Sequence, residues 1–219
     1  MSRAASEGQP PRLLLYVDAQ FLSPYAMSCF VSLSEKAIPF EIDTVDLSKG
    51  ENHRDEFVRT SVTRRVPTLV HGQFCLSESS AISEYLDEAF RDVGRRLYPM
   101  DARQRARVRQ VQAWLRSDLL PIRQERPTEV VFYGARKPEL SVQAQAAVEK
   151  LYAAADLLIP HESEYLCGEW SIADVDLALM LSRLALHGDH IPERLAVYAR
   201  RQWARPSVQL WVNRTRPPL

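Results

Sequence analysis

In the first part of the chain, the spacing of hydrophobic residues switches between the pattern of a strand and the pattern of a helix. Residues 12–17 (RLLLYV) form a short apolar run and residues 40–45 (FEIDTV) alternate, so both segments predict strands. Between them, apolar residues recur every three or four positions, which predicts one face of a helix over 24–37. Ser23-Pro24 stands where this helix begins, because serine caps helices and proline suits their first position.

Two more apolar runs, 66–70 and 74–76, flank a His-Gly turn, and this spacing predicts an antiparallel hairpin. A second amphipathic helix is expected to open at residues 77–80, directly after the hairpin. The polar stretch 46–63 predicts a connection with one short helix. The expected order in this part of the chain is therefore β-α-β-(α)-β-β-α.

Beyond a charged linker at 91–100, every periodic segment has helical spacing. The predicted helices cover 101–125, 141–158, a segment from Ser171 onward, 192–201 and 206–213. Strands followed by helices alone indicate two segregated parts. We therefore expect an α/β domain over 12–92 and an all-α domain over 99–219.

The chain has 219 residues, of which 28 are basic and 28 acidic, so its formal net charge is zero. This balance gives no electrostatic reason to expect nucleic acid as a partner, and no apolar run is long enough to predict a membrane span. Residues 1–11 have no apolar core of a secretory signal and predict a short mobile tail. The three widely spaced cysteines contain no CxxC pair, which favours a reduced, cytoplasmic protein. The segment 187–190 (HGDH) lacks a further ligand pattern, so no metal is predicted.

Four motifs give the chain a family resemblance: Ser23-Pro24-Tyr25, RVPTL at 65–69, LSESSAI at 76–82 and WSIAD at 170–174. With these motifs, nearly the whole chain resembles the cytosolic glutathione transferases, and within them a small bacterial, serine-type branch. The resemblance implies a thioredoxin-like N-terminal domain that holds glutathione and an all-helical C-terminal domain. In the last motif, Ser171 and Asp174 have the spacing of a capping box, to which we assign a structural role.

The second and third motifs imply the glutathione pocket. Pro67 is expected in the cis form, and the Val66 backbone is expected to pair with the cysteinyl backbone of glutathione. The helix that starts after Glu78 favours the γ-glutamyl carboxylate, to which Ser79 can donate, while the Glu78 carboxylate can pair with the ammonium group. Arg65 is a candidate for the glycyl carboxylate. The alternatives are an edge strand that begins at Pro67, a simple helix cap at 78–79 and a solvated charge at Arg65.

The first motif implies the catalytic group. The Ser23 hydroxyl would donate a hydrogen bond to the glutathione sulfur, which lowers the thiol pKa and supplies more thiolate. The alternative is a plain helix cap. No cysteine stands at this helix start, which argues against mixed-disulfide chemistry, and Cys29 is expected in the core. Tyr25 and Trp114 are hypotheses for walls of the second-substrate pocket, and Trp114 is alternatively core between the domains.

The resemblance implies a glutathione transferase, a homodimer that uses glutathione as co-substrate in detoxification, with no metal expected. Its thiolate would attack a small electrophile or reduce a hydroperoxide. A non-enzymatic binding or regulatory protein on the same scaffold is a second interpretation. A glutathione-dependent isomerase is a third, which needs basic residues in the cleft to bind a carboxylate, with Arg123 or Arg126 as the candidates. Many relatives have Asn-Pro five residues before the Val-Pro, where this chain has Ser61-Val62, so the loop at the glycyl end is expected to differ.

Overall fold

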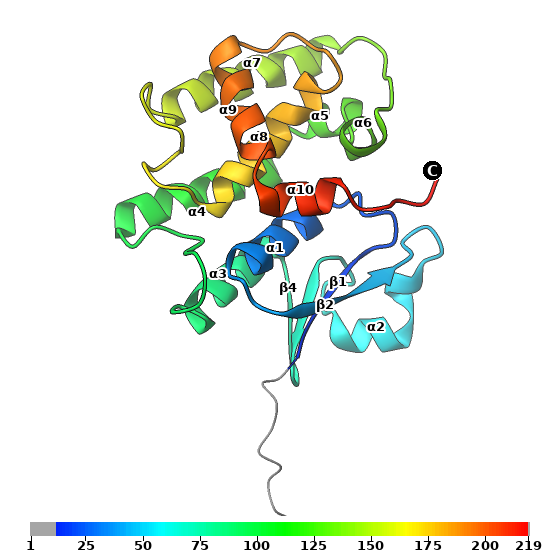
Figure 1. Ribbon diagram of the computed structural model, residues 1–219. Helices are drawn as coiled ribbons and strands as arrows, with labels where there is room; N and C mark the ends of the chain where they lie inside the picture. Colours follow the sequence, from blue (N-terminus) through cyan, green and yellow to red (C-terminus); the bar gives the residue numbers. More distant parts are fainter. Residues whose placement is uncertain (1–11, 219) are drawn as a thin grey trace, which may run out of the picture.

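The computed structural model describes residues 12–218, and the tail predicted at 1–11 lies outside this range. A four-stranded sheet with the order β2-β1-β3-β4 organises the first part of the chain (Figure 1). Its strands are β1 (Leu13–Asp18), β2 (Phe40–Val45), β3 (Thr68–His71) and β4 (Phe74–Ser77). β1 and β2 run parallel, whereas β3 is antiparallel to both β1 and β4, which confirms the hairpin. β3 begins two residues later than predicted, since Pro67 has no N–H to give to a ladder.

Helices cover both faces of this sheet. α1 (Pro24–Glu35) and α3 (Ser79–Ala89) pack on one face, where alternate residues of β1 are buried in the main core. On the other face lies α2 (Asp55–Thr60), which follows a short 3₁₀ turn, η1 (Glu51–His53). Tyr16 of β1 packs edge-on against Phe57 of α2 in a separate small cluster. This arrangement is the thioredoxin-like fold that the sequence predicts.

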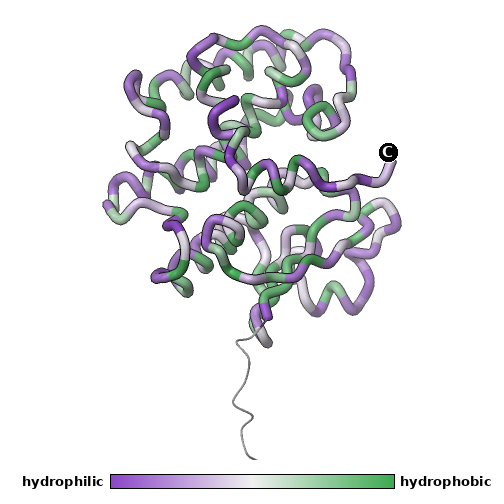
Figure 2. Tube along the Cα trace, in the orientation of Figure 1, coloured by the Kyte–Doolittle hydropathy of each residue, from purple (hydrophilic) through white to green (hydrophobic). Residues whose placement is uncertain are grey.

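The rest of the described chain forms helices. They are α4 (Ala102–Ser117), α5 (Leu120–Glu125), α6 (Thr128–Tyr133), α7 (Val142–Leu158), α8 (Ile172–Ala185), α9 (Glu193–Trp203) and α10 (Pro206–Val212). The sequence pattern did not predict the short α6. Along the tube of Figure 2, hydrophobic and hydrophilic positions alternate through these helices, as amphipathic packing requires. No helix within residues 12–218 combines the length and apolarity needed to cross a bilayer.

The single helix predicted over 101–125 is wrong at its middle. α4 ends at Ser117 and α5 begins at Leu120, and Leu119 between them has a φ of 59°, in the left-handed region. Asp118 stabilises this break, since its carboxylate accepts hydrogen bonds from Leu119 N at 2.7 Å and from Trp114 Nε1 at 3.0 Å. The apolar stripe continues through the break because Leu119 is buried, so the sequence pattern does not reveal it.

One apolar core extends across both parts of the molecule. α1 lies between the sheet and the helices α8 and α10 (Figure 1). The linker at 91–100 is docked rather than loose: Leu97 N donates to Asp87 Oδ1 at 2.8 Å, and Leu97 O accepts from Ile172 N at 3.0 Å. Gly94, with a φ of 60°, passes so close to the end of α1 that a Cβ there would lie 2.2 Å from the Lys36 carbonyl oxygen. These contacts fix the ends of α1 and α3 relative to the helical part.

Candidate active site

Three segments with predicted site residues meet at one edge of the sheet. Tyr16 of β1 pairs with Thr68 of β3, which in turn pairs with Ser77 of β4. The end of β1, the beginning of β3 and the end of β4 therefore lie side by side. The loop to α1 leaves this edge, the Val-Pro pair enters it, and α3 begins directly after it.

A buried carboxylate at the end of β1 holds Ser23 at the start of α1. Asp18 accepts hydrogen bonds from the backbone N–H groups of Leu22 at 2.6 Å and Ser23 at 2.9 Å. Ser23 caps α1, since its Oγ accepts from Ala26 N at 3.1 Å. That bond uses a lone pair and leaves the hydroxyl hydrogen available, because a serine hydroxyl is both donor and acceptor. No acceptor for this hydrogen is found among residues 12–218. Capping and donation to a ligand are therefore compatible roles for the same oxygen.

The peptide bond between Val66 and Pro67 is cis, as the resemblance implies. Both residues are buried at the sheet edge, whereas the Arg65 side chain is exposed. Ser61 stands where many relatives have asparagine, and its Oγ donates to the Arg65 carbonyl at 3.2 Å. Thr68 Oγ1 donates to the same carbonyl at 2.9 Å. These two hydroxyl groups anchor the loop that carries Val66 without the asparagine.

The start of α3 combines backbone strain with an open hydroxyl. Glu78 has a φ of 73°, which is rare for a residue with a side chain and costs on the order of 1–3 kcal/mol. Such strain is concentrated at functional sites. The Glu78 side chain is exposed, while Ser79 is buried as the first residue of the helix. Ser79 Oγ accepts two hydrogen bonds from Arg116 and, like Ser23 Oγ, has no acceptor for its hydrogen among the described residues.

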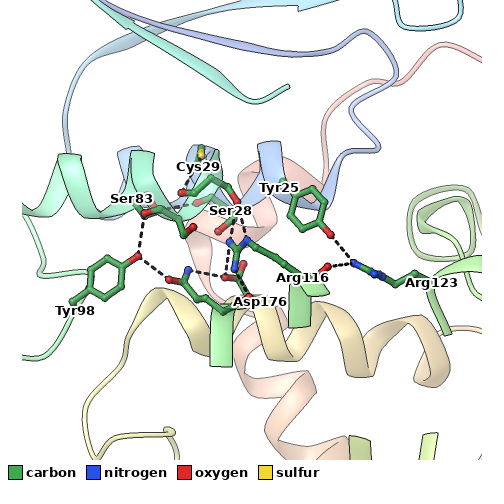
Figure 3. A network of polar contacts seen from close by, with 12 residues as sticks. Tyr25, Ser28, Cys29, Ser83, Tyr98, Arg116, Arg123 and Asp176 are labelled. Carbon is green, nitrogen blue, oxygen red and sulfur yellow. Dashed lines mark hydrogen bonds and ion pairs between the residues drawn. The ribbon is translucent and has the colours of Figure 1, made fainter. Parts of the chain in front are cut away.

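Arg116 is a site residue that the sequence interpretation missed. From α4 it reaches across the domain boundary and donates to Ser79 Oγ from Nε at 3.1 Å and from Nη2 at 2.9 Å (Figure 3). Asp176 of α8 accepts from the same guanidinium at 3.3 Å, which balances its charge. Arg116 follows the buried Gln112 by four positions and so lies on the inward face of α4. That spacing could have distinguished it from the exposed arginines earlier in this helix.

Tyr25 lines a narrow cleft between the two parts of the molecule. Its hydroxyl accepts a hydrogen bond from Arg123 Nη1 at 2.9 Å, and the same nitrogen donates to the Arg116 carbonyl at 2.8 Å (Figure 3). The Arg116 guanidinium lies 5.6 Å from the centre of the Tyr25 ring, within reach of a cation–π attraction. The cleft is thus bounded by α1, α4, α5 and α8, and its lining includes Pro24, the residue after Ser23.

Trp114 does not line the Tyr25 cleft. It lies on another face of α4, where it lines a groove with α7 residues such as Leu157, and its Nε1 donates to Asp118 Oδ2. This contact is within the helical part rather than between the domains. The structure therefore separates Trp114 from the other predicted site residues.

Cys29 and the segment 187–190 could also suggest chemistry, but their contacts stabilise the fold. Cys29 is buried in α1 with its Sγ donating to the Ser79 carbonyl at 3.7 Å, and burial raises the pKa of its thiol well above the usual value. Asp189 forms a bidentate pair with Arg126, at 2.6 and 2.8 Å, and lies 3.2 Å from His187 Nδ1. Within residues 12–218, no group of three or more histidine, cysteine or acidic side chains is placed to hold a metal ion.

Sequence comparisons match both parts of the chain. The model of the glutathione S-transferase N-terminal domain matches residues 19–88, and that of the C-terminal domain matches residues 101–215. Glutathione S-transferase theta-1 of Mus musculus is 34% identical over 165 residues, which cover 69% of this chain and 68% of the mouse protein. Glutathione S-transferase 1 of Dianthus caryophyllus is 31% identical over 159 residues, covering 72% and 71%. The matches to mouse theta-3 and rat theta-2 span 102 residues and 41% of each relative.

Three solved structures of similar shape include two glutathione transferases. A glutathione transferase homolog from Burkholderia gl BGR1, with bound glutathione, is 47% identical and superposes with a TM-score of 0.74, covering 92% of this chain and 96% of that one. Human glutathione-S-transferase T1-1, in an apo mutant form, is 29% identical with a TM-score of 0.69, covering 91% and 85%. The beta-etherase LigF from Sphingobium, 21% identical with a TM-score of 0.72 and covering 93% and 99%, shares the fold.

Proposed function

Because the chain belongs to the glutathione S-transferase family, we propose that it binds glutathione at the sheet edge and transfers the glutathione sulfur to a small electrophile. Two supports come from outside the site: the similar Burkholderia structure holds glutathione, and the theta-class relatives are named transferases. The remaining support is the arrangement of the site itself.

The γ-glutamyl end of glutathione belongs at the start of α3. Its carboxylate meets the free N–H groups of the helix and the open hydroxyl of Ser79, with the Arg116 guanidinium behind that hydroxyl. Its ammonium group pairs with the exposed Glu78 carboxylate. The cysteinyl backbone pairs with Val66 beside cis Pro67, and the exposed Arg65 is the candidate for the glycyl carboxylate.

Ser23 supplies the catalytic hydrogen bond in this proposal. A free thiol has a pKa of about 8.5, so at neutral pH only a few per cent is thiolate. Donation from the Ser23 hydroxyl, together with the N-terminal dipole of α1, stabilises the thiolate and lowers that pKa. The thiolate sulfur then bonds to the electrophilic carbon, and the leaving group departs with its electron pair. With a hydroperoxide, two glutathione molecules are oxidised to the disulfide while the O–O bond is reduced to an alcohol and water.

The observation that carries the proposal is the uncommitted hydrogen of the Ser23 hydroxyl at the start of α1. A scaffold used for binding alone has no need of a donor held by a buried carboxylate at this position. The Ser23 hydroxyl would stabilise the thiolate in both conjugation and hydroperoxide reduction. Assays with different substrates are therefore needed to distinguish the two activities.

A glutathione titration by calorimetry, followed by rates with aryl halide, hydroperoxide and disulfide substrates, tests the proposal. Wild type is expected to bind glutathione and to act on an aryl halide or a hydroperoxide. Ser23→Ala is expected to lose about 100- to 1000-fold in turnover, the range for removal of one hydrogen bond to a developing charge. Ser34→Ala is the matched control, because Ser34 also lies on α1 but donates to the Phe30 carbonyl. Absence of glutathione binding at millimolar concentration overturns the proposal.

The family also leads us to propose a homodimer in the cytoplasm. Light scattering of the purified protein should give twice the chain mass of 25.1 kDa. A mass of one chain at micromolar concentration contradicts the dimer without affecting the chemistry assigned to Ser23.

A further inference from the structure

The cleft beside Tyr25 has an excess of positive charge. It is a small cleft of about 30 Å³ between Tyr25 on α1 and side chains of α4, α5 and α8. Arg116, Arg123 and Arg183 line it, and Asp176 is the one acid in its described lining. Asp176 is already engaged by Gln112 Nε2 at 2.8 Å and by Arg116 at 3.3 Å. Two guanidinium groups in the cleft are therefore left without a carboxylate.

Arg183 is a buried cation, since only 4% of its surface is exposed. Its Nη1 donates to the Arg126 carbonyl at 2.7 Å, but its buried Nε has no hydrogen-bond partner among the described residues. Burial lowers the pKa of Arg183 to about 10, and the charge of Arg123 acts in the same direction. Burying a charge costs free energy unless the charge is paired. An anion bound beside Arg183 would therefore be stabilised.

Arg123 of α5, which also lines the cleft, repeats the pattern. Its Nη1 is engaged with Tyr25 and the Arg116 carbonyl, while its buried Nε has no partner among the described residues. Buried donors without partners are rare in folded proteins, and two arginines with this feature line one cleft. The planar fork of a guanidinium can bind both oxygens of a carboxylate at once, as it also does with a phosphate.

We propose that this cleft binds a carboxylate of the second substrate, so that the enzyme prefers small electrophiles that carry an acid group. The inference rests on the proposed function and names the substrate class of the same site. Arg123 and Arg183 hold the carboxylate, and Tyr25 orients Arg123. Leu179 and Met180 of α8 form the apolar wall for the organic remainder of the substrate. The electrophilic carbon then lies towards Ser23, because Pro24, the residue next to Ser23, also lines the cleft.

Two aryl halides that differ in one charge provide the probe: 4-chloro-3,5-dinitrobenzoate and its methyl ester. In both, the thiolate sulfur bonds to the ring carbon that carries chlorine, and chloride leaves with the electron pair of the C–Cl bond. The proton of the thiol passes to solvent. Each conjugate is prepared chemically and titrated into the protein by calorimetry, so the comparison does not depend on turnover. Rates with the two aryl halides, corrected for the uncatalysed reaction, give a second reading.

We expect the acid conjugate to bind at least about tenfold more tightly than the ester conjugate, as for hydrogen bonds to a charged group. Arg123→Met should reduce this acid-to-ester ratio to near one. Arg183→Lys, which retains the positive charge but not the planar fork, should reduce the ratio in part. This variant replaces Arg123→Met as the test if Arg123→Met fails to fold. Arg200→Met is the matched control, since Arg200 lies on the exposed side of α9, and it should leave the ratio unchanged.

The possible results separate this inference from the proposed function. Equal binding of the two conjugates, each tighter than millimolar, overturns the anion preference and leaves the transferase proposal standing. A preference for the acid that survives in both arginine variants also overturns the inference, because the anion is then held elsewhere. If Arg123→Met weakens glutathione itself by the same factor, the cleft holds a carboxylate of glutathione and the inference is wrong. If neither conjugate nor glutathione binds, both proposals fail.

Discussion

Serine begins helices in both halves of this molecule, but its hydroxyl is used differently in the two. In the helical part, Ser171 precedes α8 and donates from N and Oγ to Asp174 Oδ2, at 2.8 and 2.9 Å. In the thioredoxin-like part, Ser23 Oγ and Ser79 Oγ accept hydrogen bonds, and within residues 12–218 neither hydroxyl has an acceptor for its own hydrogen. The first hydroxyl is committed to the fold, and the other two are open to a ligand.

The difference teaches that the residue type at a helix start does not decide between structure and chemistry. Asp174 collects four donors, since it also accepts from Leu166 N and from the Tyr198 hydroxyl, both at 2.8 Å. Burial raises the pKa of this carboxyl group, whereas these hydrogen bonds oppose the rise. The start of α8 is thus a closed network, and such networks are costly to break and add nothing to a reaction.

Removal of Asp174 should give the largest effect on stability. In Asp174→Ala, two backbone N–H groups and two hydroxyls lose their buried acceptor, which should cost about 3–5 kcal/mol in the free energy of unfolding. Urea denaturation measures it, with Asp156→Ala as control because the Asp156 carboxylate pairs with Arg194 at the surface. A cost below about 1 kcal/mol would show that the closed network is not what stabilises α8.

Removal of Arg116 should affect glutathione binding rather than the fold. In Arg116→Met, Ser79 Oγ loses both of its donors and the start of α3 loses a nearby positive charge, so the dissociation constant for glutathione should rise about tenfold. Arg107→Met, on the exposed face of the same helix, is the control. An unchanged glutathione affinity in Arg116→Met would place Arg116 with the structural residues. Arg116→Lys should recover part of the affinity.

Asp118 should give the smallest effect, although it also accepts several hydrogen bonds. Lys150, the Leu119 N–H and Trp114 lower the pKa of its carboxyl group to about 2. The contribution of Asp118 to stability is therefore present above the unfolded-state pKa of about 4 and is lost as the pH falls towards 2. The side chain is 37% exposed, so solvent screening limits Asp118→Ala to under about 1 kcal/mol at pH 7.

Unfolding of Asp118→Ala and wild type at pH 7 and at pH 3 tests this contrast with Asp174. The difference between the two proteins should be smaller at pH 3. A cost equal to that of Asp174→Ala would mean that the number of hydrogen bonds, rather than their burial, determines stability.

Local periodicity and family motifs were sufficient for most of the fold. The strands, α1, α3, α7 and the cis peptide before Pro67 agree with the sequence prediction. The break at Leu119 was missed, because a buried residue in a left-handed conformation continues the apolar stripe without a glycine to mark it. α6 is six residues long, too short for a helical period to be distinguished from chance.

The site was less predictable than the fold, since it depends on contacts between distant segments. The motifs predict Ser23 and Ser79, but the contact of Arg116 with Ser79 spans 37 positions in the sequence. Trp114 is two positions before Arg116 in sequence and yet lies on another face of α4. A helix turns by about 100° per residue, so two side chains that are two positions apart point in nearly opposite directions.

The central claim is that the open hydroxyl of Ser23 stabilises the thiolate of bound glutathione. The ultraviolet absorbance of the thiolate, titrated with pH in the complexes of wild type and Ser23→Ala, tests it directly. The pKa of the bound thiol should lie at least about one unit below its free value in wild type, which corresponds to a hydrogen bond to a charged acceptor. In Ser23→Ala it should return towards the free value while glutathione remains bound. Identical titration curves for the two complexes would contradict the account and leave Ser23 as a helix cap.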